Sequence, residues 1–145
     1  MWKVAMQHSL RDVMNLIARV VVGGTFVAHA YQKFAINGMG ATVEGFGAMG
    51  IPLPALAAWF TALVELLGGL ALVVGVALPV AGALLALVML GALVLAHSSA
   101  FFVANGGFEY VLVLAAASLA LGFSGSRFTL AAAFGKDRGK AEAAS

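Results

Sequence analysis

The sequence contains no cysteine, few charged residues and only three prolines in 145 positions. The absence of cysteine excludes disulfides, thiol redox chemistry and thiolate metal ligands. Charged residues make up 10% of the chain, whereas soluble globular domains average about 25%. This shortage excludes an ordinary water-soluble domain.

Hydrophobic residues are abundant instead, at 63% of the chain with a mean hydropathy of +1.05. Such a composition indicates an integral membrane protein whose principal partner is the lipid bilayer. The net charge is +2, and the basic residues lie mainly near the two ends of the chain. Basic residues so placed report membrane topology rather than nucleic-acid binding. We therefore expect an all-α membrane protein with no nucleic-acid partner.

Four apolar stretches predict a four-helix transmembrane bundle, because a crossing needs roughly 20 mostly apolar residues. The predicted spans are residues 12–34, 54–77, 80–97 and 108–123. They form one domain over residues 1–124, followed by a basic cytoplasmic tail at residues 125–145. Asn37, Gly38 and Gly40 end the first span, and residues 41–49 are expected to form a broken amphipathic turn at the membrane surface. Pro54 and Pro79 open the next two helices.

The first span resembles a secretory signal because it ends in the A-x-A pattern Ala28-His29-Ala30. Its uninterrupted apolar run after Arg19 is about eight residues, near the lower limit for a signal peptide. We therefore expect this segment to be retained as a membrane span. Basic residues before the first span and after the last place both termini in the cytoplasm.

Arg19 lies inside the first span, where an arginine facing lipid would cost several kcal/mol. Helical periodicity places it on one face with Asn15, Phe26, Ala30 and Lys33, and with His29 at the edge of that face. This face must turn toward other helices and find an anion. Glu65, near the middle of the second span, is the leading candidate at a similar depth. We expect direct or one-water contact between Arg19 and Glu65, either as a functional site or as a structural pair.

A second group of polar residues is expected at the outer mouth of the bundle. It comprises His29, Lys33, His97, Glu109 and Tyr110. We predict a pocket there that is lined by these residues with Phe101, roofed by residues 100–107 and open sideways to lipid. In it Glu109 should accept a hydrogen bond from a histidine or lysine. No metal is assigned, and whether His29, His97 and Glu109 bind an ion stays open, as does their reading as capping or interfacial residues.

Several motifs resemble the DoxX family of small bacterial four-helix membrane proteins. They are A-H-A-Y-Q-K-F after Arg19, L-V-E-L-L-G-G-L-A-L-V-V-G around Glu65, and G-G-F-E-Y at the start of the fourth span. The resemblance covers about residues 15–122. It implies a four-helix fold in the bacterial inner (cytoplasmic) membrane and a link to membrane redox systems, one of which is a thiosulfate:quinone oxidoreductase.

Three functional classes follow from these observations. In the first, the chain is the membrane subunit of an oxidoreductase complex and binds a quinone through its polar groups. It would receive electrons from a partner redox protein, because the sequence contains no nucleotide fingerprint and no thiol pair. In the second, the chain is a non-catalytic anchor or assembly partner, as a homo-oligomer or with another protein. A small-molecule carrier is disfavoured because four short helices enclose little volume. Whether the chain is itself an enzyme stays open.

Overall fold

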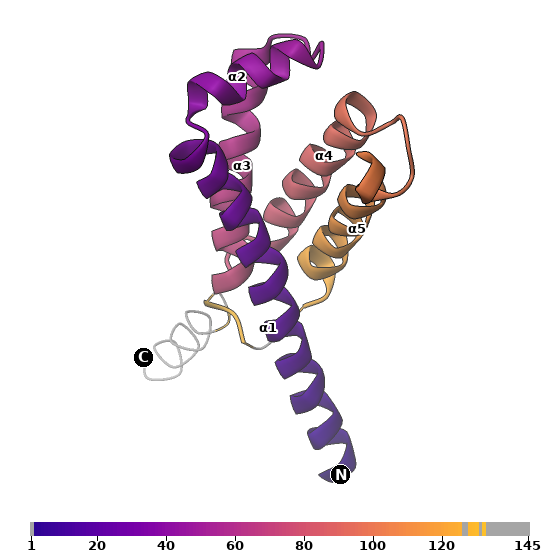
Figure 1. The fold of residues 1–145 in the computed structure, drawn as a ribbon. Coiled ribbons are helices and arrows are strands. Elements are labelled where there is room, and N and C mark those ends of the chain that lie inside the picture. The colour runs from indigo at the N-terminus through magenta and orange to yellow at the C-terminus, as the bar shows by residue number, and fades with distance from the viewer. Residues whose placement is uncertain (1, 126–127, 131, 133–145) are drawn as a thin grey trace, which may run out of the picture.

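A computed structural model describes residues 2–125, 128–130 and 132, whose regular secondary structure is all helical, without strands. This confirms the predicted all-α class. The described residues include five α-helices, which are α1 (Trp2–Tyr31), α2 (Met39–Ala48), α3 (Pro54–Val74), α4 (Leu78–Ala96) and α5 (Glu109–Phe123) (Figure 1). A π-helical turn, Gln32–Ile36, extends α1, and a 3₁₀ turn, Val103–Asn105, precedes α5. Most of the predicted tail at residues 125–145 lies outside the described residues.

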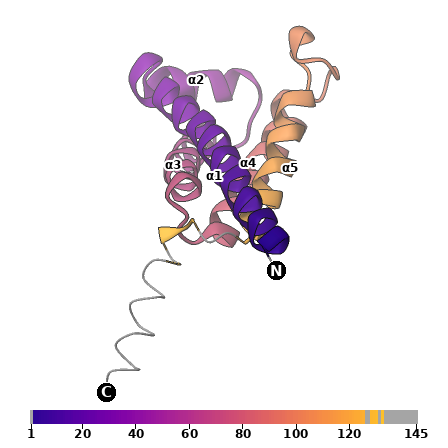
Figure 2. The ribbon, with the colours of Figure 1, turned by 90° about the horizontal axis from the view of Figure 1, so that it is seen from below.

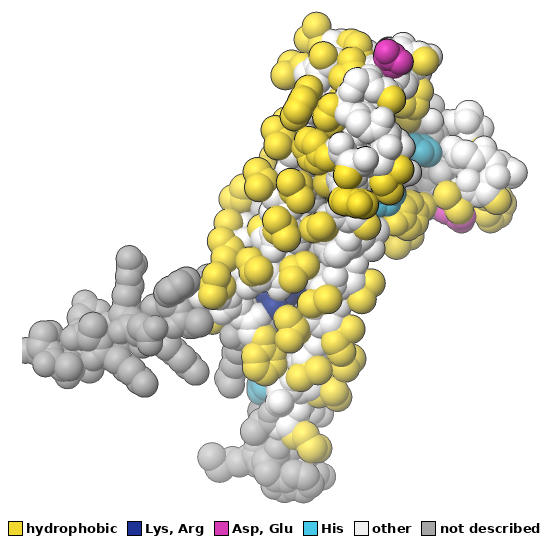
Figure 3. Space-filling model, turned by 60° about the vertical axis from the view of Figure 1, so that its left-hand side comes forward, with side chains coloured by type: hydrophobic (Ala, Val, Ile, Leu, Met, Phe, Trp, Pro, Cys, Tyr) yellow, Lys and Arg dark blue, Asp and Glu magenta, His cyan; other side chains and the backbone are white. Residues whose placement is uncertain are grey.

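Three helical segments among the described residues are long and apolar enough to cross a membrane. They are Met6–Ile36, Pro54–Val74 and Leu78–Ala96, whereas the apolar helix α5 has 15 residues. Large hydrophobic side chains such as Val21, Leu67 and Leu87 are more than half exposed. Figure 3 shows hydrophobic side chains covering one face of the molecule along most of its length. A surface of this kind is suited to lipid rather than to water.

The amino-terminal part of the chain is more helical than its sequence suggests. Helix α1 begins at Trp2, ahead of the predicted membrane span at residues 12–34, because residues 2–22 contain neither glycine nor proline to interrupt it. The predicted broken turn at residues 41–49 is instead part of the continuous helix α2, which packs against α3. Its buried Thr42 donates a hydrogen bond to the Gly38 carbonyl at 2.9 Å. Tertiary packing therefore outweighs the low helix propensity of glycine in this segment.

Paired glycines bring the helices into close contact at two crossings. A Cβ on Gly23 of α1 would lie 2.6 Å from the Gly69 carbonyl oxygen of α3, and one on Gly69 would lie 2.7 Å from the Gly23 oxygen. At the α4–α5 crossing, a Cβ on Gly122 would lie 3.0 Å from the Gly82 Cα. Backbone atoms cannot move away as a side chain can. Gly69 and Gly122 therefore serve as packing residues between the helices.

The helices pack in the order α1, α3, α4 and α5. Helices α3 and α4 form an antiparallel hairpin, whose short connection includes Gly75 with φ of +79°. From this connection the two helices diverge toward the end of the bundle where α2 lies (Figures 1 and 2). The fully buried side chains Phe26, Leu72 and Leu85 form part of the hydrophobic core. The divergence leaves room for a cavity between the helices.

Candidate functional site

A cavity of about 600 Å³ occupies the bundle on the side of α2. Its walls come from α1, the π-helical turn, α3, α4 and α5, and from Phe46, Met49 and Ile51 in and after α2. Most of the lining is apolar. The polar side chains on its wall are those of His29, Lys33, Thr61, Glu65, His97 and Tyr110. Its size and its few polar groups on an apolar wall are typical of a small-molecule site.

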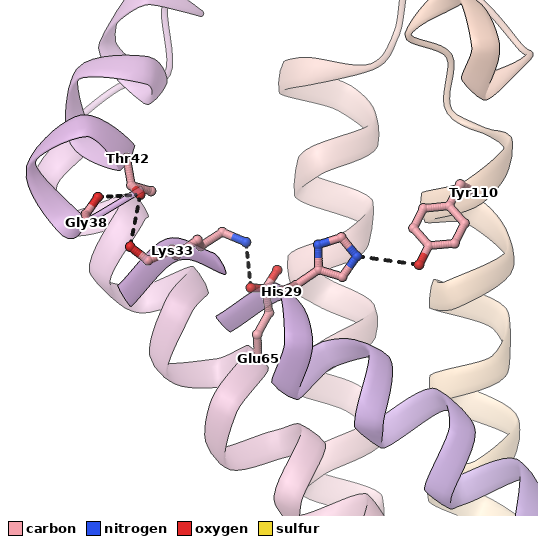
Figure 4. A network of polar contacts seen from close by, with 6 residues as sticks. All are labelled: His29, Lys33, Gly38, Thr42, Glu65 and Tyr110. Carbon is pink, nitrogen blue, oxygen red and sulfur yellow. Dashed lines mark hydrogen bonds and ion pairs between the residues drawn. The ribbon is translucent and has the colours of Figure 1, made fainter. Parts of the chain in front are cut away.

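Lys33 and Glu65 form an ion pair on this wall (Figure 4). Lys33 Nζ donates to Glu65 Oε2 at 2.6 Å. The Glu65 side chain is 3% exposed and that of Lys33 is 16% exposed, so the carboxylate depends on the ammonium group for its solvation. Lys33 belongs to the π-helical turn, a geometry that is uncommon and is often found at functional sites.

The two histidines line the cavity in different ways. His29 Nε2 lies 3.4 Å from the Tyr110 hydroxyl, so this contact joins α1 to α5 across the cavity (Figure 4). His97 directly follows α4, and its Nδ1 lies 3.1 Å from the Ala92 carbonyl oxygen. A carbonyl oxygen can only accept, so Nδ1 carries the proton. In the neutral ring Nε2 is then an acceptor, and on protonation it becomes a second donor.

Glu109 and Phe101 do not line the cavity, contrary to the sequence prediction. Glu109 Oε1 accepts a hydrogen bond from the Val103 backbone N–H at 2.9 Å, and not from a histidine or lysine. Phe101 packs edge-on against Phe102 and Phe108, with centroid distances of 5.2 and 5.3 Å. The predicted roof over the cavity is therefore wrong. The hydrogen bonds of residues 100–107 run within their own loop and to Phe108 and Glu109, as from the Asn105 and Gly107 N–H groups to the Phe102 carbonyl.

Arg19 is fully buried but lies far from Glu65, so the predicted contact between them is also wrong. Its Nη2 donates to the Phe128 carbonyl oxygen, and its Nη1 would lie 2.5 Å from a Cβ on Gly75. Gly75 is ten residues beyond Glu65 on the sequence of α3, or about 15 Å along a helix. The Gly23–Gly69 crossing sets this register between the antiparallel helices. Matching depths alone could not reveal it.

The helix face that contains Arg19 turns inward, as predicted. Phe26 and Ala30 on that face are fully buried, as Arg19 is. Asn15 donates to the Ser124 hydroxyl at 2.6 Å. Within the described ranges, no three histidine, aspartate or glutamate side chains come close enough to hold one metal ion. The cavity therefore presents hydrogen-bonding groups and one ion pair rather than a cluster of metal ligands.

Sequence reasoning missed two features of the site. It did not pair Lys33 with Glu65, because 32 positions separate the two residues in the sequence. Both nevertheless lie on inward faces of neighbouring helical segments. It also assigned no wall of the cavity to Phe46, Met49 and Ile51. The sequence contained a signal for the second feature, which is a large apolar residue, Ile51, in the turn between Gly50 and Pro52. In the structure Ile51 is buried.

Comparison with known proteins relates the chain to a family of membrane proteins. The family model described as DoxX matches residues 14–98. A protein of Bacillus subtilis (strain 168) named "Putative oxidoreductase CatD" is 38% identical over 117 residues, which cover 81% of this chain and 83% of that protein. No solved structure matches. The matched residues include Lys33, Glu65 and His97, which all line the cavity.

Proposed function

This chain belongs to the DoxX family of membrane proteins, and we propose that it is the membrane subunit of a redox system that binds a quinone-like ligand in the α3–α4 cavity. We define this cavity as the space lined by Lys33, Glu65, His29, His97 and Tyr110. In this proposal four helices, including α5, cross the bacterial inner membrane, and both termini are cytoplasmic. The name of the Bacillus subtilis relative, an oxidoreductase, supports the redox assignment.

The Lys33–Glu65 ion pair on the cavity wall is the observation that carries this proposal. A quinone has carbonyl oxygens that accept hydrogen bonds and a flat ring that suits an apolar wall. An ammonium group has three N–H donors, and Glu65 Oε2 takes one of those of Lys33. The Tyr110 hydroxyl is a further donor on the same wall. These groups make the cavity complementary to a carbonyl-bearing ring.

The protein's own residues hold and orient the ligand in this proposal, and a partner redox protein supplies the electrons. The chain has no cysteine for thiol redox chemistry. The quinone, when bound, accepts or delivers electrons and protons, which is chemistry that side chains alone do not perform. Glu65 and His97 line the cavity and are groups that exchange protons with water or ligands.

A non-catalytic anchor is the alternative function. The same ion pair is also consistent with this function. Lys33 and Glu65 join the end of α1 to α3, and each neutralises the charge of the other. Such pairs can serve only to specify how helices pack. The anchor would bring a partner protein to the membrane and would bind no ring in the cavity.

Binding of a water-soluble benzoquinone to the purified protein distinguishes the two functions. We expect saturable binding in the wild type and about tenfold weaker binding in Tyr110→Phe, the loss expected for one hydrogen bond of about 1.4 kcal/mol. Glu109→Gln is the matched control, because Glu109 lies outside the cavity and glutamine still accepts from the Val103 N–H. Equal binding in all three proteins, or none in the wild type, would support the anchor.

A further inference from the structure

Exposed wall residues show where the cavity is open. Three of them, at 40 to 48% exposure, lie near helix ends: Met49, Leu95 and Tyr110. Phe60 of α3 and Leu87 of α4 lie farther from the helix ends, and 45% and 57% of their surfaces are exposed. A wall residue that is half exposed also faces the outside of the protein. Besides the opening at the helix ends, the wall is therefore open between α3 and α4, which diverge from their short connection (Figure 1).

The opening between α3 and α4 lies at the depth of the hydrocarbon. Leu87 is close to the midpoint of α4, which spans Leu78–Ala96 and has a hydropathy of 2.5 over its most apolar window. It is about 13 Å from either end of that helix at a rise of 1.5 Å per residue. A molecule that leaves the cavity at this level enters the acyl chains and not water.

Gly91 contributes empty space to the same wall. It lines the cavity, and a Cβ built on it meets no atom within 4 Å. It is one turn beyond Leu87 on α4 and therefore lies on the same side of the helix. The gap beside Gly91 and the exposure of Leu87 together describe a passage from the cavity to the lipid.

The cavity volume limits what the cavity can hold. About 600 Å³ is typical of a pocket for a drug-sized ligand, which is enough for a ring and a few attached carbons. A long isoprenoid tail attached to that ring must leave the cavity. The passage beside Gly91 leads the tail into an apolar environment, whereas the other end of the cavity is bordered by His97 and Tyr110.

From this geometry we propose that the natural ligand is a membrane-dissolved quinone with a long isoprenoid tail, which passes between Phe60 and Leu87 beside Gly91 while the ring contacts Lys33. The inference rests on the proposed function and adds the class of ligand and its route. The tail moves from lipid to an apolar protein surface, so little hydrophobic free energy is gained from its burial. The passage therefore selects the ligand by shape.

The test compares two probes with the same benzoquinone ring in lipid nanodiscs. One carries a single isoprene unit and is water-soluble, and the other carries a full-length tail. Gly91→Leu should fill the passage without a clash and weaken binding of the tailed probe by about tenfold or more, comparable to the loss of one good contact. Binding of the short probe should be weakened less, so that the ratio of the two affinities changes by about fivefold or more. Leu87→Trp, at a lipid-exposed position, is a second blocking variant with the same expectation.

Gly24→Leu is the matched control, because a Cβ on Gly24 also meets no atom within 4 Å, yet this glycine does not line the cavity. It should leave binding of both probes unchanged. If Gly91→Leu and Leu87→Trp bind the tailed probe as the wild type does, the lateral route is wrong while the proposed function stands. If the wild type binds neither probe, the proposed function itself fails. Native mass spectrometry gives a further test. A phospholipid that stays bound to the wild type, is lost from Gly91→Leu and is not displaced by the tailed quinone would also overturn the inference.

Discussion

Lys33 and Glu65 form a 2.6 Å ion pair that links the π-helical turn after α1 to the middle of α3. The two side chains differ in exposure, at 16% for Lys33 and 3% for Glu65. The long lysine chain can carry its ammonium group toward a more polar region if the partner is lost. The carboxylate of Glu65 has no such freedom, so the pair is asymmetric.

This asymmetry predicts unequal effects of breaking the pair. We expect Lys33→Met to lower the free energy of unfolding by about 3 to 5 kcal/mol, because it leaves Glu65 buried and unpaired. Glu65→Gln should cost less, because Lys33 retains partial access to solvent. Thermal unfolding of the purified proteins in one detergent measures both. The double replacement Lys33→Met with Glu65→Leu should recover much of the loss, and equal stability of all four proteins would contradict the prediction.

Arg19 should not be energetically coupled to Glu65. The two lie at levels of α3 about 15 Å apart, and Arg19 contacts the Phe128 carbonyl instead. A double-mutant cycle with Arg19→Met and Glu65→Gln should therefore be additive within about 0.5 kcal/mol. The cycle with Lys33→Met and Glu65→Gln is the positive control and should show coupling above that level. Coupling of equal size in both cycles would show that Arg19 and Glu65 do interact, and would contradict the prediction.

The α1–α3 crossing should tolerate no side chain at Gly23. A Cβ there would lie 2.6 Å from the Gly69 carbonyl oxygen and 2.9 Å from Val73 Cγ2, so Gly23→Ala should cost about 1 to 3 kcal/mol of stability. The adjacent Gly24 has open space at its Cβ position. Gly24→Ala should be neutral or stabilising, because alanine favours helix more than glycine does. Thermal unfolding of the two variants measures the contrast, and similar losses would argue against this crossing.

The basic residues predict the membrane topology. Reporter fusions after Ser145 and within α2 should lie on opposite sides of the membrane, with the carboxyl-terminal fusion in the cytoplasm. If only α1, α3 and α4 crossed the membrane, the two ends of the chain would lie on opposite sides. A cytoplasmic carboxyl-terminal fusion therefore requires that α5 also crosses. Labelling of both fusions from one side would contradict the four-span arrangement.

Much of the fold was predictable because it depends on local composition. Apolar runs of about 20 residues form helices in a membrane whatever their partners, since each backbone polar group must be satisfied within its own segment. Pro54 and Pro79 open helices as predicted, and Gly38, with φ of +78°, precedes α2. The start of α1 was not predictable from hydropathy, because helix can continue into polar sequence where nothing interrupts it.

The sequence by itself determined that this chain is an all-α protein with membrane-length helices and that Arg19 and Glu65 turn inward, because charges are costly in lipid. Only the tertiary structure decided which charges meet. The close approach of Gly23 and Gly69 sets the register of α1 on α3, and this register brings Lys33 to Glu65 and Arg19 to Gly75. Register depends on backbone contacts between segments far apart in the chain, and the periodicity of one helix contains no information about its offset from another.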